Sequence, residues 1–170
     1  VLDQVTYEGF ASHGVAVIIE CVTDNRNRTV SDLRHILSSH GGALGEGGSG
    51  GGQFKRIAFF AFAAGNRTED QIFEFAIEAG ADDVWSEDGQ VEITGPVEAF
   101  KRIGDALKKA GITVTDAGLR MEPNQEIELS PEETLQVMRV IEALEELDDV
   151  QSVSYNLKIS DDALEKIAAA

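Results

Sequence analysis

Apolar residues recur along the chain with two periods, and together they predict a fold that mixes strands and helices. Alternating or continuous apolar runs, typical of strands, lie at residues 4–11, 15–22, 57–62, 83–86, 90–94, 112–121 and 150–159. Stripes with the helical period lie at residues 29–40, 68–79, 96–110 and 131–147. The run at 15–22 is almost entirely apolar, which is typical of a central strand covered on both faces.

The middle of the chain, residues 54–122, predicts a complete βαββαβ unit. Thr68 and Gln71 have the spacing of a capping box at the start of its first helix. Asp88-Gly89 is a strong hairpin signal between two short strands, and Pro96 opens the second helix. This element order is that of the ferredoxin-like, or split βαβ, arrangement.

The flanking segments predict a second unit that this middle unit interrupts. Residues 1–53 supply two strands and a helix, and residues 123–170 supply a helix opened by Ser130-Pro131 and a final strand. The predicted fold class is therefore α+β, with two ferredoxin-like α/β sandwich domains, one inserted into the other. The outer domain comprises 1–53 plus 123–170, and the inserted βαββαβ domain comprises 54–122.

A glycine tract at residues 41–52 separates the two predicted domains on the N-terminal side. It contains eight of the 17 glycines and little that could be buried, so it predicts a flexible connection. The stretch 47–52, which is richest in glycine, lacks the Gly-Lys-Ser/Thr ending of a phosphate-binding loop.

The net charge of −17 argues against a chain that binds nucleic acid over its whole surface. Nucleic-acid binding draws most of its free energy from cations that neutralise phosphates, so any such contact must be local. No apolar run approaches the roughly 20 residues of a membrane span, and no segment resembles a signal peptide. We expect a cytoplasmic protein, or a mitochondrial matrix protein if the source is a eukaryote, with no membrane partner.

The sequence offers no catalytic residues, no metal ligands and no cofactor site, so we expect a protein that is not an enzyme. The histidines, His13, His35 and His40, lack the spacing of a metal motif. Cys21, the one cysteine, lies inside an apolar strand and is expected to be buried and inert. Trp85 is expected to pack within its hairpin.

The clearest functional signal lies where the strand at 15–22 passes into the next helix. Thr29 and Asp32 suit a helix N-cap and its partner, while Arg26 and Arg28 bring cations to a helix end that favours anions. Two interpretations stay open: the arginines pair with Asp24 and Asp32, or they contact the phosphates of a nucleic acid. The candidate nucleic-acid-binding residues are Arg26, Arg28, Arg34, Asn25 and Asn27.

Six short motifs are distributed along the chain: Tyr7-Glu8-Gly9-Phe10, Asp24-Asn25-Arg26-Asn27-Arg28-Thr29-Val30, Arg34-His35, Gly41-Gly42, Ala79-Gly80-Ala81-Asp82-Asp83 and Asp148-Asp149-Val150-Gln151. Together they closely resemble the YebC/PmpR family, which includes the mitochondrial translational activator of cytochrome c oxidase. This resemblance implies two α/β domains, one inserted in the other, and a basic helical N-terminal domain that would precede Val1 and is absent here. The chain departs from the family at Gly50-Gly51-Gly52, where apolar and aromatic residues are usual.

The resemblance implies a non-enzymatic regulator of gene expression that binds nucleic acid. The family has been described both as DNA-binding transcriptional regulators and as ribosome-associated translation factors, and the missing N-terminal domain would make most of the contact. The alternative is a small-ligand-sensing regulatory module built from paired ferredoxin-like domains. That alternative predicts an apolar pocket with convergent polar groups near the domain junction.

Overall fold

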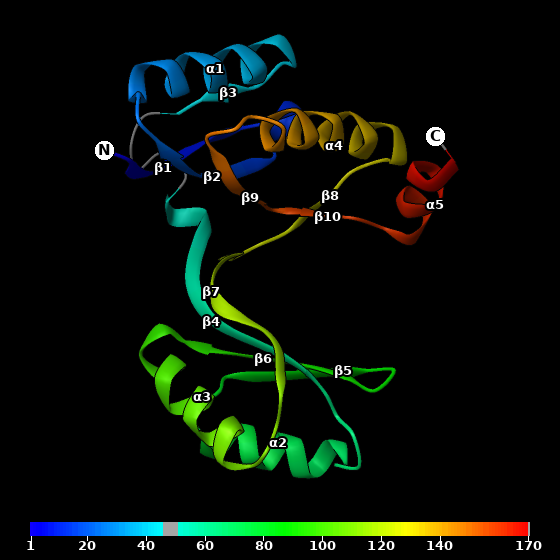
Figure 1. Ribbon diagram of the computed structural model, residues 1–170. Helices are drawn as coiled ribbons and strands as arrows, with labels where there is room; N and C mark the ends of the chain where they lie inside the picture. The colour runs from blue at the N-terminus through cyan, green and yellow to red at the C-terminus, as the bar shows by residue number, and fades with distance from the viewer. Residues whose placement is uncertain (46–50, 170) are drawn as a thin grey trace. The chain divides into compact units, whose positions relative to one another are not determined.

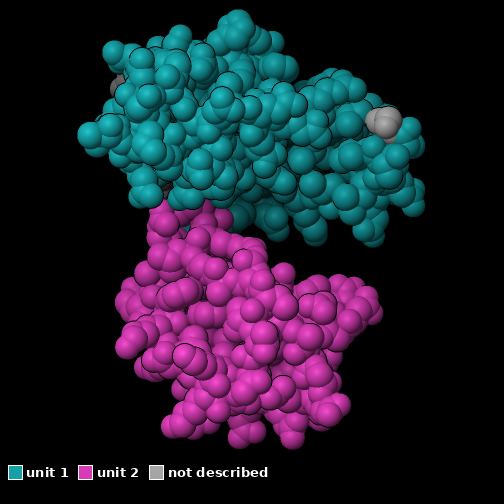
Figure 2. Space-filling model, viewed as in Figure 1, with its two compact units in different colours: residues 1–55, 122–170 teal, residues 56–121 magenta. Residues whose placement is uncertain are grey.

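The computed structural model describes residues 1–45 and 51–169. These residues form two compact units, 1–55 with 122–170 (unit 1) and 56–121 (unit 2), which are coloured separately in Figure 2. Of the glycine tract 41–52, for which we predict a flexible connection, residues 46–50 lie outside the described residues. The prediction is wrong at Ala43 and Leu44, which pair as a short strand with Phe10 and Gly9. None of the described helices is both long enough and apolar enough to cross a membrane.

Unit 1 contains a four-stranded antiparallel sheet with the order β3-β1-β2-β9 (Figure 1). A separate parallel pair joins β8 and β10. Its elements in chain order are β1 (Asp3–Phe10), β2 (Ala16–Thr23), α1 (Arg26–Ser39), β3 (Ala43–Leu44), β8 (Ile127–Glu128), α4 (Pro131–Glu145), β9 (Val150–Tyr155), β10 (Leu157–Lys158) and α5 (Asp161–Ala169).

The strand order of unit 1 is that of a ferredoxin-like sandwich in which one inner strand comes first along the chain. Strands β2 and β3, which α1 connects, are not neighbours in the sheet. Strand β1 lies between them. The connection α4-β9 then adds the strand on the other side of β2. Unit 1 is therefore an α/β sandwich of the predicted class, with β1 moved to the front of the sequence.

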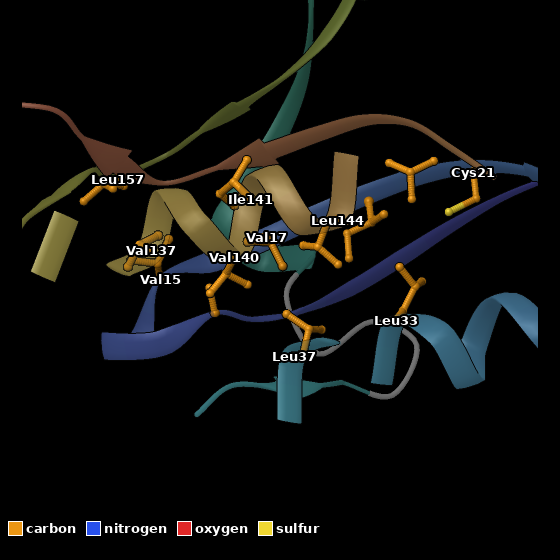
Figure 3. Close-up of a cluster of buried hydrophobic side chains, with 13 residues drawn as sticks. Val15, Val17, Cys21, Leu33, Leu37, Val137, Val140, Ile141, Leu144 and Leu157 are labelled. Carbon is orange, nitrogen blue, oxygen red and sulfur yellow. The ribbon is translucent and has the colours of Figure 1, made fainter. Parts of the chain in front are cut away.

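The core of unit 1 lies between the sheet and the two helices α1 and α4. Alternate residues of β2 (Val17, Ile19 and Cys21) meet Leu33 and Leu37 of α1 in one buried cluster (Figure 3). Helix α4 contributes four residues to the same cluster, namely Val137, Val140, Ile141 and Leu144. Because β2 also buries Ala16 and Ile18 on its opposite face, the strand reads as the continuous apolar run seen in the sequence.

The predicted strand at 150–159 is wrong in one respect, because the ladder breaks at Asn156. The side chain of Asn156 is buried, and its Oδ1 accepts the N–H of Ala16 at 2.9 Å. The carbonyl of the same residue accepts the N–H of Ile127 at 2.8 Å. Asn156 thus joins β2 to the start of β8, and the chain leaves the large sheet to pair with β8 instead of continuing along β2.

Helix α1 begins three residues earlier than its apolar stripe predicts. The N-cap is Asn25, whose Oδ1 accepts the N–H of Arg28 at 3.1 Å. Thr29, which the sequence places at the cap, is instead a buried residue of the first turn. Arg26 and Arg28 therefore belong to the helix itself rather than to the loop before it.

Unit 2 has the sheet order β5-β6-β4-β7, which is the ferredoxin-like order for its βαββαβ sequence (Figure 1). Its elements are β4 (Phe54–Ala63), α2 (Glu69–Glu78), β5 (Asp83–Glu87), β6 (Gln90–Pro96), α3 (Phe100–Lys109) and β7 (Val114–Pro123), with the ends of β4 and β7 reaching into unit 1. The Thr68–Gln71 capping box is confirmed. Asp88 and Gly89 both have positive φ angles, as a type I′ hairpin requires.

The expectation that Trp85 packs within its hairpin is wrong. Along β5 the side chains alternate, with Val84 and Ser86 half-buried toward the helices and Trp85 exposed on the opposite face. Neighbouring residues of a strand point to opposite faces of the sheet, so a one-residue change of register exchanges packed and exposed side chains. In a strand as short as β5 the sequence pattern does not determine which face each residue occupies.

Candidate nucleic-acid interface

The corner between β2 and α1 is held by a compact set of polar contacts. Thr23, the last residue of β2, accepts the N–H of Asn25 through its Oγ1 at 2.9 Å. Thr29 donates its hydroxyl to the carboxylate of Asp149 at 2.8 Å and also lies 2.8 Å from the Thr23 hydroxyl. The turn before β9 supplies Asp149, whose carbonyl accepts the N–H of Val22 at 2.9 Å. Sheet pairing thus brings two distant stretches of chain to one corner.

Both arginines at the start of α1 are paired with carboxylates. Arg28 lies 2.9 Å from Asp24 and 3.0 Å from Asp149, and the Nε of Arg26 lies 3.2 Å from Asp3. Asp24 is therefore a partner, as one of the two sequence interpretations has it. Asp32 makes no ion pair with either arginine among the described residues, because Asp149 and Asp3 take that role from other parts of the fold.

The carboxylate of Asp149 is held ionised by its neighbours. Its hydrogen bond from the buried hydroxyl of Thr29 lowers the pKa most, and the Arg28 guanidinium lowers that pKa further, while partial burial opposes both. On the other side of the pair, hydrogen bonds to Asp149 and then Asp24 raise the pKa of Arg28. Asp149 thereby neutralises the charge of Arg28, which would otherwise lie unpaired at the positive N-terminal end of α1.

The surface around Arg28 is anionic. A hollow of about 520 Å³ is lined by Arg28 with Leu147 and by five carboxylates, which are Asp24, Asp32, Glu146, Asp148 and Asp149. One guanidinium among five carboxylates leaves a net negative field, which repels phosphate. Arg28 in this arrangement is a poor phosphate ligand and a good structural clamp.

A neighbouring stripe of residues on α1 contains no carboxylates. Asn27, Ser31, Arg34 and Ser38 are spaced by four, three and four residues, so they share one helix face, which lies beside the face that buries Leu33 and Leu37. They line a hollow of about 540 Å³ together with Val30 and His35. We call these six residues the α1 stripe. Within the described chain, Arg34 has no carboxylate partner, so its guanidinium faces solvent.

The structure thus divides the five candidate residues into two groups. Asn25 caps the helix, and Arg26 and Arg28 are engaged in ion pairs. Asn27 and Arg34 lie together on the α1 stripe. Ser31 and Ser38 were not singled out in the sequence, although their helical spacing from Asn27 is visible there.

Metal-binding clusters and the thiol of Cys21 are the remaining groups with a possible chemical role. The described residues hold no group of three or more His, Cys, Asp and Glu side chains arranged to bind a metal ion. Cys21 is buried, as predicted, and burial raises the pKa of its thiol to about 11, so the thiol is neutral at physiological pH. A neutral buried thiol is a weak nucleophile.

The lowered pKa of Asp149 predicts a loss of stability in acid. A carboxylate whose pKa is lower in the folded than in the unfolded protein stabilises the fold above its unfolded value of about 3.9, and that contribution disappears as pH falls through the folded value. Asp149→Asn should therefore have a lower free energy of unfolding at neutral pH and a shallower loss of it below about pH 4. Urea titrations across this range measure both quantities.

Asp148→Asn is the matched control, because it removes the same charge from an exposed neighbour with no bond to Arg28 or Thr29 among the described residues. It should keep the acid dependence of the unsubstituted protein. Identical pH profiles for the two variants would show that Asp149 is not held ionised by the fold.

Comparison with known proteins identifies relatives over nearly the whole chain. The family model described as "TACO1/YebC second and third domain" matches residues 2–157. A protein of Hahella chejuensis and one of Legionella pneumophila, both named probable transcriptional regulatory proteins, are 45% and 42% identical over 97% and 95% of this chain. This chain covers 66% and 65% of their respective lengths, so it spans about two thirds of these curated relatives.

A solved structure shows the same fold. The crystal structure of a conserved hypothetical protein, Aq1575 from Aquifex aeolicus, matches 94% of this chain and 66% of its own chain, with a TM-score of 0.82 and 36% sequence identity.

Proposed function

Because this chain belongs to the TACO1/YebC family, we propose that it regulates gene expression by binding the phosphate backbone of a nucleic acid, without a catalytic step. Its curated relatives are named probable transcriptional regulatory proteins. A regulator needs a surface that recognises its target, and in this chain the α1 stripe is the surface whose chemistry suits phosphate best.

The observation that carries the proposal is the unpaired Arg34 at the centre of the α1 stripe. Its guanidinium is flanked by hydroxyl, amide and imidazole groups, all of which can donate hydrogen bonds to phosphate oxygens. Arg26 and Arg28, by contrast, are already neutralised by carboxylates. We therefore place the phosphate contact at Arg34 and Asn27, and we assign Arg28 and Asn25 to positioning the helix.

The charge of the chain limits what this contact can do alone. With a net charge of −17, one exposed arginine gives weak, salt-sensitive binding. We propose that other parts of the full protein, such as the basic N-terminal domain implied by the family resemblance, supply most of the cations. The α1 stripe then fixes the orientation of the bound duplex or ribosomal RNA.

Arg34→Ala should weaken binding of the chain to a random duplex DNA or to ribosomes at low salt by roughly three- to tenfold, and reduce the salt slope by about 1. The melting temperature should hardly change, because Arg34 is exposed and makes no ion pair among the described residues. A mobility shift measures duplex binding, and co-sedimentation measures ribosome binding, so the two assays also separate the two targets.

Arg139→Ala provides the matched control. Arg139 is an exposed arginine on α4 of the same unit, also without an ion-pair partner in the part of the chain that the structure describes. If both substitutions weaken binding equally, the effect is one of net charge and the α1 stripe has no special role.

Small-ligand sensing is the second candidate, and one feature of unit 2 bears on it. A mainly apolar hollow of about 330 Å³ is lined by Arg67, Gln71, Ile72, Phe75, Ala110 and Ile112. Its polar groups are already engaged, since Arg67 donates to the carbonyl of Ala110 at 2.9 Å and the Gln71 side chain closes the capping box. Because the fold already holds both polar side chains in place, they do not converge on the hollow as a ligand site requires, and the nucleic-acid proposal is favoured over ligand sensing.

A further inference from the structure

Strand β5 is an open edge of the unit 2 sheet with exposed apolar side chains on both of its faces. It ends the strand order β5-β6-β4-β7 and pairs only with β6 among the described strands (Figure 1). Trp85 of β5 is 50% exposed on the helix-free face. On the helix side, Phe73 and Ile77 of α2 are 53% and 41% exposed. An edge strand flanked in this way offers unpaired backbone groups and apolar contacts together.

The stretch of chain that contains this edge strand is strongly acidic. Residues 68–100 contain no lysine, arginine or histidine and ten carboxylates, at Glu69, Asp70, Glu74, Glu78, Asp82, Asp83, Glu87, Asp88, Glu92 and Glu98. Such a field repels nucleic acid and attracts cations. The phosphate contact proposed above therefore cannot extend to this surface, and a partner here must be basic.

Acidic side chains on an edge strand also have a simpler role, since charge prevents edge-to-edge aggregation. That role explains Asp83 and Glu87 but not the exposure of Trp85 and Phe73. Large exposed aromatic side chains add to the aggregation hazard that the charges would reduce. The combination of aromatic residues and carboxylates fits recognition better than protection.

We propose that β5 binds an extended, lysine- or arginine-rich segment of a partner protein as an additional strand. Backbone pairing along an open edge supplies affinity, and alternate side chains of the added strand supply specificity. This inference concerns a protein partner of unit 2 and does not depend on the proposed nucleic-acid contact of unit 1.

The two faces of the edge suit two kinds of side chain. On the helix-free face, Asp83 and Glu87 lie two residues either side of Trp85, and Glu92 lies directly across from it on β6. An indole ring surrounded by three carboxylates suits the ammonium or guanidinium group of a partner residue, which gains both a cation–π contact and ion pairs.

On the helix side, a hollow of about 250 Å³ lies between α2 and β5. It is lined by Glu69, Asp70, Ile72, Phe73, Val84 and Ser86. Its apolar floor suits an aliphatic side chain, and its acidic rim suits a neighbouring cation. A segment that alternates basic and aliphatic residues therefore places one type on each face of the extended sheet.

The probe is a terminally blocked synthetic peptide of alternating lysine and valine, added to the 170-residue chain at low salt. Trp85 is the single tryptophan, so intrinsic fluorescence reports on this surface directly. Binding should shift the emission to shorter wavelength, reduce acrylamide quenching and weaken as salt is added. Phe73→Ala should weaken binding roughly tenfold, and Trp85→Ala, followed by a dye on the peptide, should do the same.

Two controls separate strand addition from simple charge attraction. The same peptide N-methylated at alternate residues keeps its charge but loses backbone pairing, and it should bind at least about tenfold more weakly. Leu119→Ala removes a 44% exposed apolar side chain from β7, at the opposite edge of the sheet, and should leave binding unchanged.

Three outcomes would overturn the proposal. Equal binding of the methylated peptide would show that charge alone acts. A Trp85 that is shielded from acrylamide in the free chain, or becomes shielded as protein concentration rises, would show that this chain or a second copy already covers the edge. Tighter binding of a single-stranded oligonucleotide than of the basic peptide would assign the surface to nucleic acid.

Discussion

Phe62→Ala is expected to destabilise unit 2 by about 3–5 kcal/mol. Phe62 lies on β4, the strand between β6 and β7, and its ring is fully buried. It belongs to the cluster that joins the sheet to both helices, through Ile72 of α2 and Leu107 of α3. Neighbours on three elements cannot all move into the space left by the ring, so the cavity remains and adds to the lost transfer free energy.

Urea unfolding followed by tryptophan fluorescence reports on unit 2, because the single tryptophan, Trp85, belongs to that unit. Phe73→Ala is the matched control, since it removes the same side chain from an exposed site of the same unit. That substitution should change the free energy of unfolding by about 0.5 kcal/mol or less. Equal losses in the two variants would mean that the ring of Phe62 does not stabilise the core of unit 2.

Leu37→Ala should destabilise unit 1 by about 2–5 kcal/mol. Leu37 is fully buried beneath the last turn of α1, in the cluster that includes Val17 of β2 and Leu144 of α4 (Figure 3). Its removal leaves a cavity between the sheet and both helices. Because unit 1 contains both tyrosines, Tyr7 and Tyr155, near-ultraviolet circular dichroism in the tyrosine band follows its unfolding.

Leu164→Ala is the control for this second substitution, because Leu164 lies on α5 of the same unit and is 50% exposed.

The same pair of variants also tests whether the position of the α1 stripe depends on the packing of Leu37. Nucleic-acid binding by Leu37→Ala should fall only in proportion to the unfolded fraction, because Leu37 is buried and is not one of the residues of the stripe. A larger fall would show that the orientation of α1 itself depends on Leu37.

The fold class could be predicted because the relevant signals are local. The Thr68–Gln71 capping box, the Asp88-Gly89 turn and the Ser130-Pro131 helix start are all present where the sequence places them. Each depends on residues within four positions of one another, so no knowledge of the rest of the chain is needed. The fold-class prediction, two α/β sandwiches, is confirmed by the two sheets with their helices.

The short elements could not be predicted for the opposite reason. Strands β3, β8 and β10 contain two residues each, too few to show a period. Each forms because a segment from elsewhere in the chain offers backbone groups for pairing. The N–H of Ile127, for example, donates to the carbonyl of Asn156. Similarly, α1 begins after Asn25 and not at Thr29, whose hydroxyl donates to Asp149 from a distant part of the chain.

Residues that are neighbours in the chain are sufficient to predict the longer strands, four of the helices, the family resemblance and the segment that carries the arginines. The role of each arginine depends on the folded arrangement. Arg28 meets Asp149 across 121 positions of the chain, whereas Arg34, which lies further along the same helix, has no such partner in the described chain. The strength of an ion pair depends on the distance between its two charges. Arg28 and Asp149 come close only when β2 and β9 have paired in the folded protein.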